Sequence, residues 1–259
     1  MTLRFIETER GAFRYELTGQ GDGPVLVLLH EMGGSLHSWD AVMPVLIKSR
    51  RVLRYDIRGY GMSVKVTGRF EMSDWVADLA ALLDALAIAA PVDLAGCAFN
   101  GGTVLAFAAA HPTRVRKVLA MSPVTEVLAE RRAAIAEMSD RMEHQGMAAV
   151  IDNIENSYPE YLRTDAAAYA AFRARWLGND PRSFAESYRM LARLAMMDDL
   201  ARITCPVLLV GAKGDPLRPP ALVTPLQARI AGSDYREVDS GHYLPVQTPE
   251  IFLDLADWF

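Results

Sequence analysis

Short apolar runs alternate with helix-like segments along most of the chain, and this alternation constrains the fold more than any other feature. Continuous apolar runs such as Val25–Leu29 are typical of strands that are covered on both faces. Strands separated by helices predict an α/β fold, with a mostly parallel central sheet and helices on both of its faces. The expected parallel strands are Val25–Leu29, Arg51–Asp56, Val92–Ala95, Val115–Met121, Pro206–Gly211 and Tyr235–Val238, after a first hairpin formed by Phe5–Glu7 and Phe13–Thr18.

A long stretch between two of these strands has no strand-like run. It is rich in Ala, Met, Arg and Glu, and it predicts three or four helices. The expected helices are Val124–Glu137, Met138–Glu155, Asp165–Leu177 and Pro181–Met197. We therefore expect residues 1–122 and 204–259 to form one core and residues 123–203 to form an inserted helical cap.

The segment Pro91–Thr103 reads as a buried strand that turns sharply into a helix. Gly96 permits a tight turn, and the glycine pair that follows Asn100 lets an Ala-rich helix lie close to the sheet. This is the outline of a nucleophile elbow, the Gly-x-Ser-x-Gly turn that holds a reactive serine above a helix N-terminus. With Gly96 as the first glycine, Ala98 takes the place of the serine and Asn100 that of the second glycine.

Composition excludes several classes of function. The 259 residues carry a net charge of −5 with acidic and basic residues interspersed, so neither nucleic acid nor a membrane surface is an expected partner. The most apolar region, Leu79–Ala95, is interrupted by charged residues and a proline, which argues against a transmembrane helix. The segment Met1–Arg10 is charged throughout and unlike a signal peptide, and Cys97 and Cys205 lack metal-ligand spacing. We expect a cytoplasmic protein without metal or organic cofactor.

Four loops follow expected strands and carry polar or glycine-rich sequences. They are His30-Glu-Met-Gly-Gly-Ser35, Asp56-Ile-Arg-Gly-Tyr-Gly-Met-Ser63, Gly211-Ala-Lys-Gly-Asp215 and Ser240-Gly-His242. In this order, together with the elbow, they resemble the α/β-hydrolase superfamily over nearly the whole chain. The passage from Asp198 into the strand at Val207 makes the chain most similar to the 3-oxoadipate enol-lactonase and C–C hydrolase group.

The resemblance implies roles for individual residues. Ala98 stands at the nucleophile position, Asp215 corresponds to the acid and His242 to the base, with Glu126 as an alternative acid. The backbone N–H groups of Met32 and Phe99 would form the oxyanion hole, which stabilises negative charge on a reacting oxygen.

Other residues are candidates for the substrate pocket. Glu31 replaces the usual glycine after His30, so it is either a turned-out loop residue or a functional group. Trp176 and Met197 are expected to line an apolar pocket above Ala98. A substrate carboxylate would find its partner among the cap arginines Arg131, Arg132, Arg141, Arg173, Arg175 and Arg189.

Three explanations account for the missing serine. Ala98 is an introduced replacement, and the chain binds without reacting; or alanine is native, as in superfamily members that resemble the aminoacrylate hydrolase of pyrimidine breakdown. In the second case His242 would activate water or deprotonate the substrate directly. In the third, Cys97 is the nucleophile, although it lies one residue early.

We expect an enzyme that hydrolyses an ester, lactone, enamine, carbamate or C–C bond in a small carbonyl compound. The alternatives are an enol-lactonase-like or esterase-like serine hydrolase carrying a Ser-to-Ala change at position 98, and a non-catalytic ligand-binding member of the fold. The substrate and the oligomeric state, with a homodimer as one option, stay open at this point.

Overall fold

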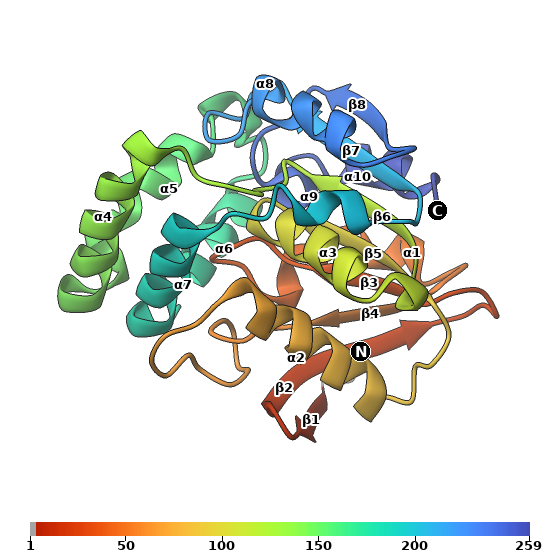
Figure 1. Cartoon of the computed structure of the whole chain (residues 1–259). Coiled ribbons are helices and arrows are strands. Elements are labelled where there is room, and N and C mark those ends of the chain that lie inside the picture. The colour runs from red at the N-terminus through yellow and green to blue at the C-terminus, as the bar shows by residue number, and fades with distance from the viewer. Residues whose placement is uncertain (1–3) are drawn as a thin grey trace.

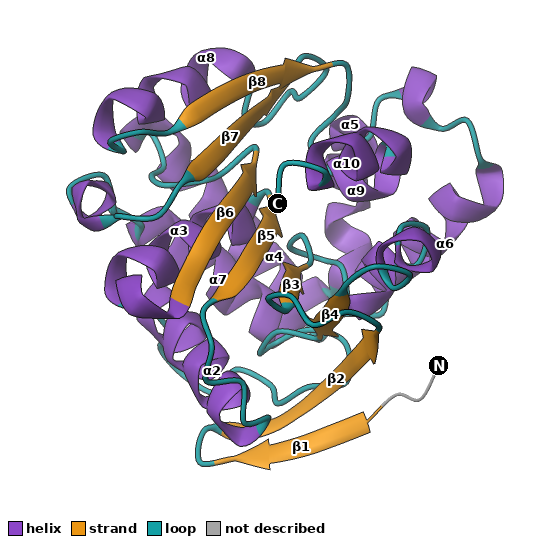
Figure 2. Ribbon diagram, turned by 90° about the vertical axis from the view of Figure 1, so that its right-hand side faces the viewer, coloured by secondary structure: helices purple, strands orange, loops and turns teal. Residues whose placement is uncertain are grey.

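The computed structural model describes residues 4–259 and contains one eight-stranded sheet. The strand order is β1-β2-β4-β3-β5-β6-β7-β8, and Figure 2 shows the strongly twisted sheet from β1 at one edge to β8 at the other. Only the pairs β1–β2 and β2–β4 are antiparallel. The strands are β1 (Arg4–Thr8), β2 (Gly11–Gly19), β3 (Leu26–Leu29), β4 (Arg51–Tyr55), β5 (Val92–Cys97), β6 (Val115–Met121), β7 (Val207–Ala212) and β8 (Asp234–Val238). The predicted α/β class and mostly parallel sheet are confirmed.

Helices cover both faces of the sheet because the central strands are apolar on both sides. In β3, Val27 and Leu29 belong to one core cluster, whereas Leu26 and Leu28 belong to the other. The first cluster packs against α2 (Met72–Ala85) and α3 (Phe99–Ala110), which lie on the near face of the sheet in Figure 1. The second packs against the shorter elements α1 (Met43–Leu46), α9 (Leu244–Gln247) and α10 (Pro249–Ala256). Another short helix, α8 (Pro220–Val223), follows β7.

The chain between β6 and β7 forms a group of helices at one end of the sheet (Figure 1). They are α4 (Arg132–Gln145), α5 (Ile151–Ser157), α6 (Ala166–Leu177) and α7 (Pro181–Arg193). The expected boundaries of the first two were wrong. A single helix runs through Glu137 and Met138, and it ends at Gly146, whose φ of 82° favours glycine.

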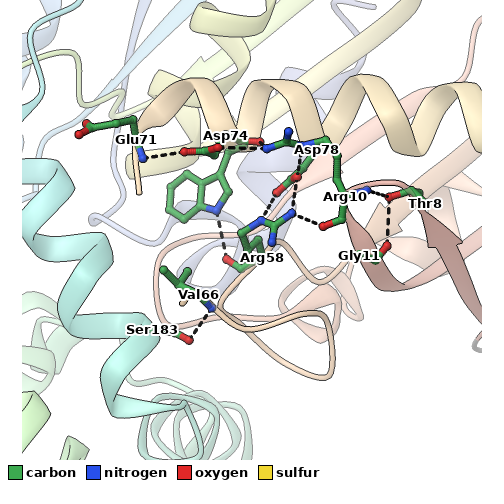
Figure 3. Close-up of polar contacts among 10 residues, drawn as sticks. Thr8, Arg10, Gly11, Arg58, Val66, Glu71, Asp74, Asp78 and Ser183 are labelled. Carbon is green, nitrogen blue, oxygen red and sulfur yellow. Dashed lines mark hydrogen bonds and ion pairs between the residues drawn. The ribbon is translucent and has the colours of Figure 1, made fainter. Parts of the chain in front are cut away.

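Acidic residues cap the start of α2. Glu71 is the N-cap residue, and its backbone N–H donates to the Asp74 carboxylate at 2.9 Å. Figure 3 shows how α2 is tied to the first hairpin and to the loop after β4 through Asp78, which accepts hydrogen bonds from Arg10 at 2.7 Å and from Arg58 at 2.6 Å. This buried carboxylate therefore braces three segments that are distant in sequence.

Candidate active site

The elbow has the backbone geometry that its sequence predicts. β5 ends at Cys97, α3 begins at Phe99, and Ala98 between them has φ 55° and ψ −121°. A conformation of this kind costs a non-glycine residue about 1–3 kcal/mol, so the surrounding structure must hold it. A Cβ on Gly96 would lie 2.1 Å from the Asn100 carbonyl oxygen, which explains the glycine before the turn. The strained turn is thus retained although its side chain is only a methyl group.

His242 and Asp215 lie together at the carboxyl ends of the strands. Asp215 is in the loop after β7 and His242 in the loop after β8. The Nδ1 atom of His242 lies 2.7 Å from Oδ2 of Asp215, and both side chains are buried. The other Asp215 oxygen accepts the backbone N–H groups of Leu217 and Arg218, each at 2.8 Å. Asp215, and not the exposed alternative Glu126, is therefore the partner of His242.

Electrostatics favour an ionised Asp215. Burial by itself raises the pKa of this carboxyl group, but the charge and hydrogen bond of His242, together with the Arg218 N–H, hold its pKa below the ordinary value. An ionised Asp215 accepts a hydrogen bond from the Nδ1–H group of His242, which leaves the Nε2 atom of His242 as a proton acceptor. Since His242 and Ala98 both line one cavity, this imidazole can take a proton from a bound molecule there.

Two residues whose backbone N–H groups have no partner in the described chain line the same cavity. Met32 and Phe99 both line it, and Phe99 is the first residue of α3, so its N–H has no partner within the helix. Within residues 4–259, neither N–H donates to any other group. Two N–H groups without a hydrogen-bond partner can together stabilise the negative charge that develops on a reacting oxygen.

Asn100 connects the elbow to the loop after β3. Its side-chain amide donates to the carbonyl oxygen of His30 and accepts the Thr103 hydroxyl at 2.8 Å. A glycine at this position could make neither hydrogen bond. The departure from the elbow pattern therefore fixes the loop that carries Met32.

Two of the three expected pocket residues do not line the cavity. Trp176 does, and it packs over Gly33. Glu31 is buried beneath the loop, where its carboxylate accepts the Ser38 hydroxyl at 2.8 Å. Met197 is turned toward Thr125, whose hydroxyl lies 3.3 Å from its sulfur atom. Both expectations were wrong because the side chains are held by hydrogen-bond partners outside the cavity.

Cys97 also faces away from the cavity. Its side chain is fully buried, and its sulfur lies 3.4 Å from the backbone carbonyl oxygen of His242. Burial, with the nearby carboxylates of Glu31 and Asp215, raises the pKa of this thiol well above its ordinary value. A protonated thiol outside the cavity is a poor nucleophile, so the geometry does not favour the third explanation.

The cavity has a volume of about 590 Å³, the size expected for a small-molecule site. The strand-end loops and the elbow contribute Met32, Ala98, Phe99 and His242, and the segment between β6 and β7 contributes side chains from α4 to α7. Of the candidate cap arginines, only Arg131 and Arg141 line it. The sequence analysis did not identify three other lining residues, Arg218, Tyr243 and Ser157. Arg218 follows Asp215 by three residues and Tyr243 follows His242 directly, and this closeness in sequence could have identified both.

The buried His30 predicts a pH-dependent stability. Its Nδ1 donates to the Glu31 carbonyl oxygen at 2.8 Å and its Nε2 accepts the Ile57 N–H at 3.2 Å, so both nitrogens are used by the neutral ring. Burial lowers the pKa of His30. The neutral His30 ring therefore makes its full contribution to the stability of the folded state above a pH of about 6.5, the ordinary pKa of histidine in the unfolded chain. This contribution is lost as the pH falls through the lower pKa that His30 has in the folded chain.

We expect the free energy of unfolding to decrease below pH 6.5, by up to about 1.4 kcal/mol per pH unit from this one proton. Urea unfolding between pH 7.5 and 5.0 measures the slope, which His30→Asn should reduce. His144→Gln is the control, because His144 is exposed on α4. Equal slopes in the wild type and His30→Asn would contradict this account of His30.

Comparisons with known proteins agree with the fold. Residues 24–168 match the family model described as alpha/beta hydrolase fold. The 2-hydroxy-6-oxo-2,4-heptadienoate hydrolase of Pseudomonas putida is 28% identical over 96% of this chain and 93% of its own length. The 3-oxoadipate enol-lactonase 2 of Acinetobacter baylyi is 24% identical over 93% of this chain and 90% of its own.

A solved structure extends the likeness to three dimensions. The crystal structure of the enol-lactonase from Burkholderia xenovorans LB400 has a TM-score of 0.91 and 24% identity, with 98% of each chain covered. None of the helices described here is long and apolar enough to cross a membrane. The family match covers more than half of the sequence and agrees with the strand order, the elbow and the relatives, and the chain belongs to the α/β-hydrolase fold family.

Proposed function

We propose that this protein is a hydrolase that acts on a small carbonyl compound without a side-chain nucleophile at position 98. The bond to be cleaved is an ester, lactone, enamine, carbamate or C–C bond. The observation that carries the proposal is the 2.7 Å contact between His242 and Asp215 at a cavity shared with Ala98 and two unpaired N–H donors. The curated relatives with a C–C hydrolase or enol-lactonase name support a small carbonyl substrate.

The reaction begins with the substrate carbonyl oxygen at the N–H groups of Met32 and Phe99. The Nε2 atom of His242 takes a proton from a water molecule, and the hydroxide adds to the carbonyl carbon. Negative charge moves to the carbonyl oxygen, where each N–H donor is worth about 3–4 kcal/mol. When the tetrahedral intermediate collapses, the imidazolium returns the proton to the leaving oxygen, nitrogen or carbon atom. Asp215 stabilises the imidazolium throughout.

The methyl group of Ala98 suits this route. It is smaller than a hydroxymethyl group, so water can approach the carbonyl carbon from the direction that a serine oxygen would take. The retained turn then serves to aim the Phe99 N–H. The elbow geometry therefore has a use even beside a residue that cannot react.

We also propose that residues 123–203 act as a cap that covers the substrate, and that residues 1–122 and 204–259 act as the catalytic core. The support is that side chains of α4 to α7 and of the strand-end loops line one cavity. Both cysteines are free and buried, which supports a reducing, cytoplasmic location.

The direct test is an assay of the purified protein against one representative of each bond class. The panel contains 4-nitrophenyl acetate, a δ-lactone, an N-acyl enamine, an aryl carbamate and a vinylogous 1,5-diketone acid. We expect turnover of at least one compound well above the rate in buffer. Binding without cleavage of any compound would instead support the non-catalytic member of the fold.

A further inference from the structure

A buried arginine lies on the cavity without a carboxylate partner. Arg218 is in the loop after β7, three residues beyond Asp215, and its exposed fraction is 6%. It lines the same cavity as Ala98 and His242. It comes from the core of the protein, so it is not one of the cap arginines that the sequence suggested.

Within residues 4–259, the Arg218 side chain donates hydrogen bonds to one backbone group and one neutral side chain. Its Nε donates to the Pro123 carbonyl oxygen at 2.9 Å, and one terminal nitrogen donates to the Thr125 hydroxyl at 3.2 Å. These bonds occupy two of the five N–H donors of a guanidinium. The remaining donors include both on the Nη1 atom, which has no hydrogen-bond partner within the described chain.

The other deeply buried arginines of the structure are paired differently. Arg14 lies 3.4 Å from the Asp56 carboxylate, and Arg54 lies 2.6 Å from Glu16. No carboxylate in the described part of the chain lies within 4.0 Å of the Arg218 guanidinium. An isolated buried charge is costly, and an anion that enters the cavity would offset that cost.

The charges around Arg218 are partly balanced. The carboxylates of Glu126 and Asp215 attract it at longer range, and the exposed Arg131 repels it. Glu126 and Arg131 line the cavity. Burial lowers the pKa of Arg218, but a guanidinium remains charged at neutral pH. The acidic lining residues Glu126, Glu130 and Glu137 are all exposed, whereas Arg218 is buried.

We propose that Arg218 binds a carboxylate of the substrate and thereby selects carbonyl compounds that carry a second, ionised carboxyl group. This inference rests on the proposed function for the reacting carbonyl, and it adds the chemical class of the substrate. The Asp215 carboxylate accepts the backbone N–H of Arg218 and also binds His242. One side chain therefore fixes both the anion-binding residue and the base, which sets the spacing between the two ends of the substrate.

The test compares two esters that differ only in one end group: mono(4-nitrophenyl) glutarate and 4-nitrophenyl pentanoate. We expect the wild type to prefer the glutarate ester at least tenfold in kcat/KM. In Arg218→Gln the preference should fall to nearly one, and in Arg218→Lys it should fall at least threefold, because an ammonium cannot donate two parallel N–H bonds. Arg131→Gln, a change at an exposed arginine on the same cavity, should keep the preference.

A binding measurement separates this inference from the proposed hydrolysis. Calorimetric titration with glutarate, and with neutral glutaramide, needs no turnover. Glutarate binding that weakens at least tenfold in folded Arg218→Gln supports the inference even if no ester is cleaved. If Arg218→Gln does not fold, the same titration is made with Arg218→Lys, in which glutarate binding should weaken at least threefold.

Two results would overturn it. One is ester cleavage by the wild type with no preference for the glutarate ester, which leaves the proposed function standing. The other is a preference, or a glutarate affinity, that is lost in Arg131→Gln and kept in the Arg218 variants.

Discussion

Replacing His242 with alanine should reduce kcat/KM for any substrate of this protein by about 10²- to 10⁴-fold, the usual contribution of a positioned general base. His242 is the one imidazole on the cavity among residues 4–259, and its Nδ1 is held by Asp215 at 2.7 Å. Without it, no imidazole in the described part of the chain would take the proton from water and return it to the leaving group. Steady-state kinetics at pH 7.5 measure the loss.

The matched control for this prediction is His144→Ala. His144 is exposed on α4, and its Nδ1 atom lies 2.8 Å from the Asp140 carbonyl oxygen. Asp215→Asn should resemble His242→Ala, because an amide cannot stabilise the imidazolium. A His242→Ala protein that is folded and within threefold of the wild type would remove His242 from the mechanism.

Replacing Asp78 with alanine should lower the free energy of unfolding by about 3 kcal/mol, the lower end of the range for breaking a buried ion pair. Its side chain is 1% exposed, whereas Arg10 and Arg58 are 28% and 15% exposed. The lower end applies because both arginines keep some contact with water. Urea unfolding of the two proteins measures the loss in the free energy of unfolding.

Asp84→Ala is the control for Asp78→Ala. Asp84 belongs to the same helix and pairs with Arg114 at 2.9 Å, but its side chain is 66% exposed. A surface pair contributes only about 0–1 kcal/mol. Equal losses in the two variants would show that burial does not determine the importance of Asp78.

The sheet could be predicted from the sequence because buried parallel strands leave a strong local signal. The run Val115–Met121 coincides with β6, and the turn at Ala98 was marked by glycines that only a tight strand-to-helix connection requires. The cap boundaries could not be predicted equally well. Helical periodicity continues across Glu137 and Met138, and the break at Gly146 depends on a positive φ that one residue type only suggests.

Some site residues could be predicted from the sequence and others could not. Asp215 and His242 were found because each follows a strand at a characteristic position, and the topology brings such loops together. The directions of the Glu31 and Met197 side chains depend on their partners Ser38 and Thr125, which are several or many residues away. Arg218 escaped notice for a similar reason, since its burial and its lack of an ion pair are properties of the folded chain.

The measurement that tests the central claim most directly is the kcat/KM of the chain with alanine at position 98 compared with that of Ala98→Ser on the same substrate. We expect an active alanine protein and a change of less than about tenfold in kcat/KM on adding the hydroxyl, since water already serves as the nucleophile. Loss of a triad serine costs about 10⁶-fold in turnover in a serine protease. An inactive alanine protein together with a gain of a thousandfold or more in Ala98→Ser would contradict the account and would indicate a serine hydrolase that has lost its nucleophile.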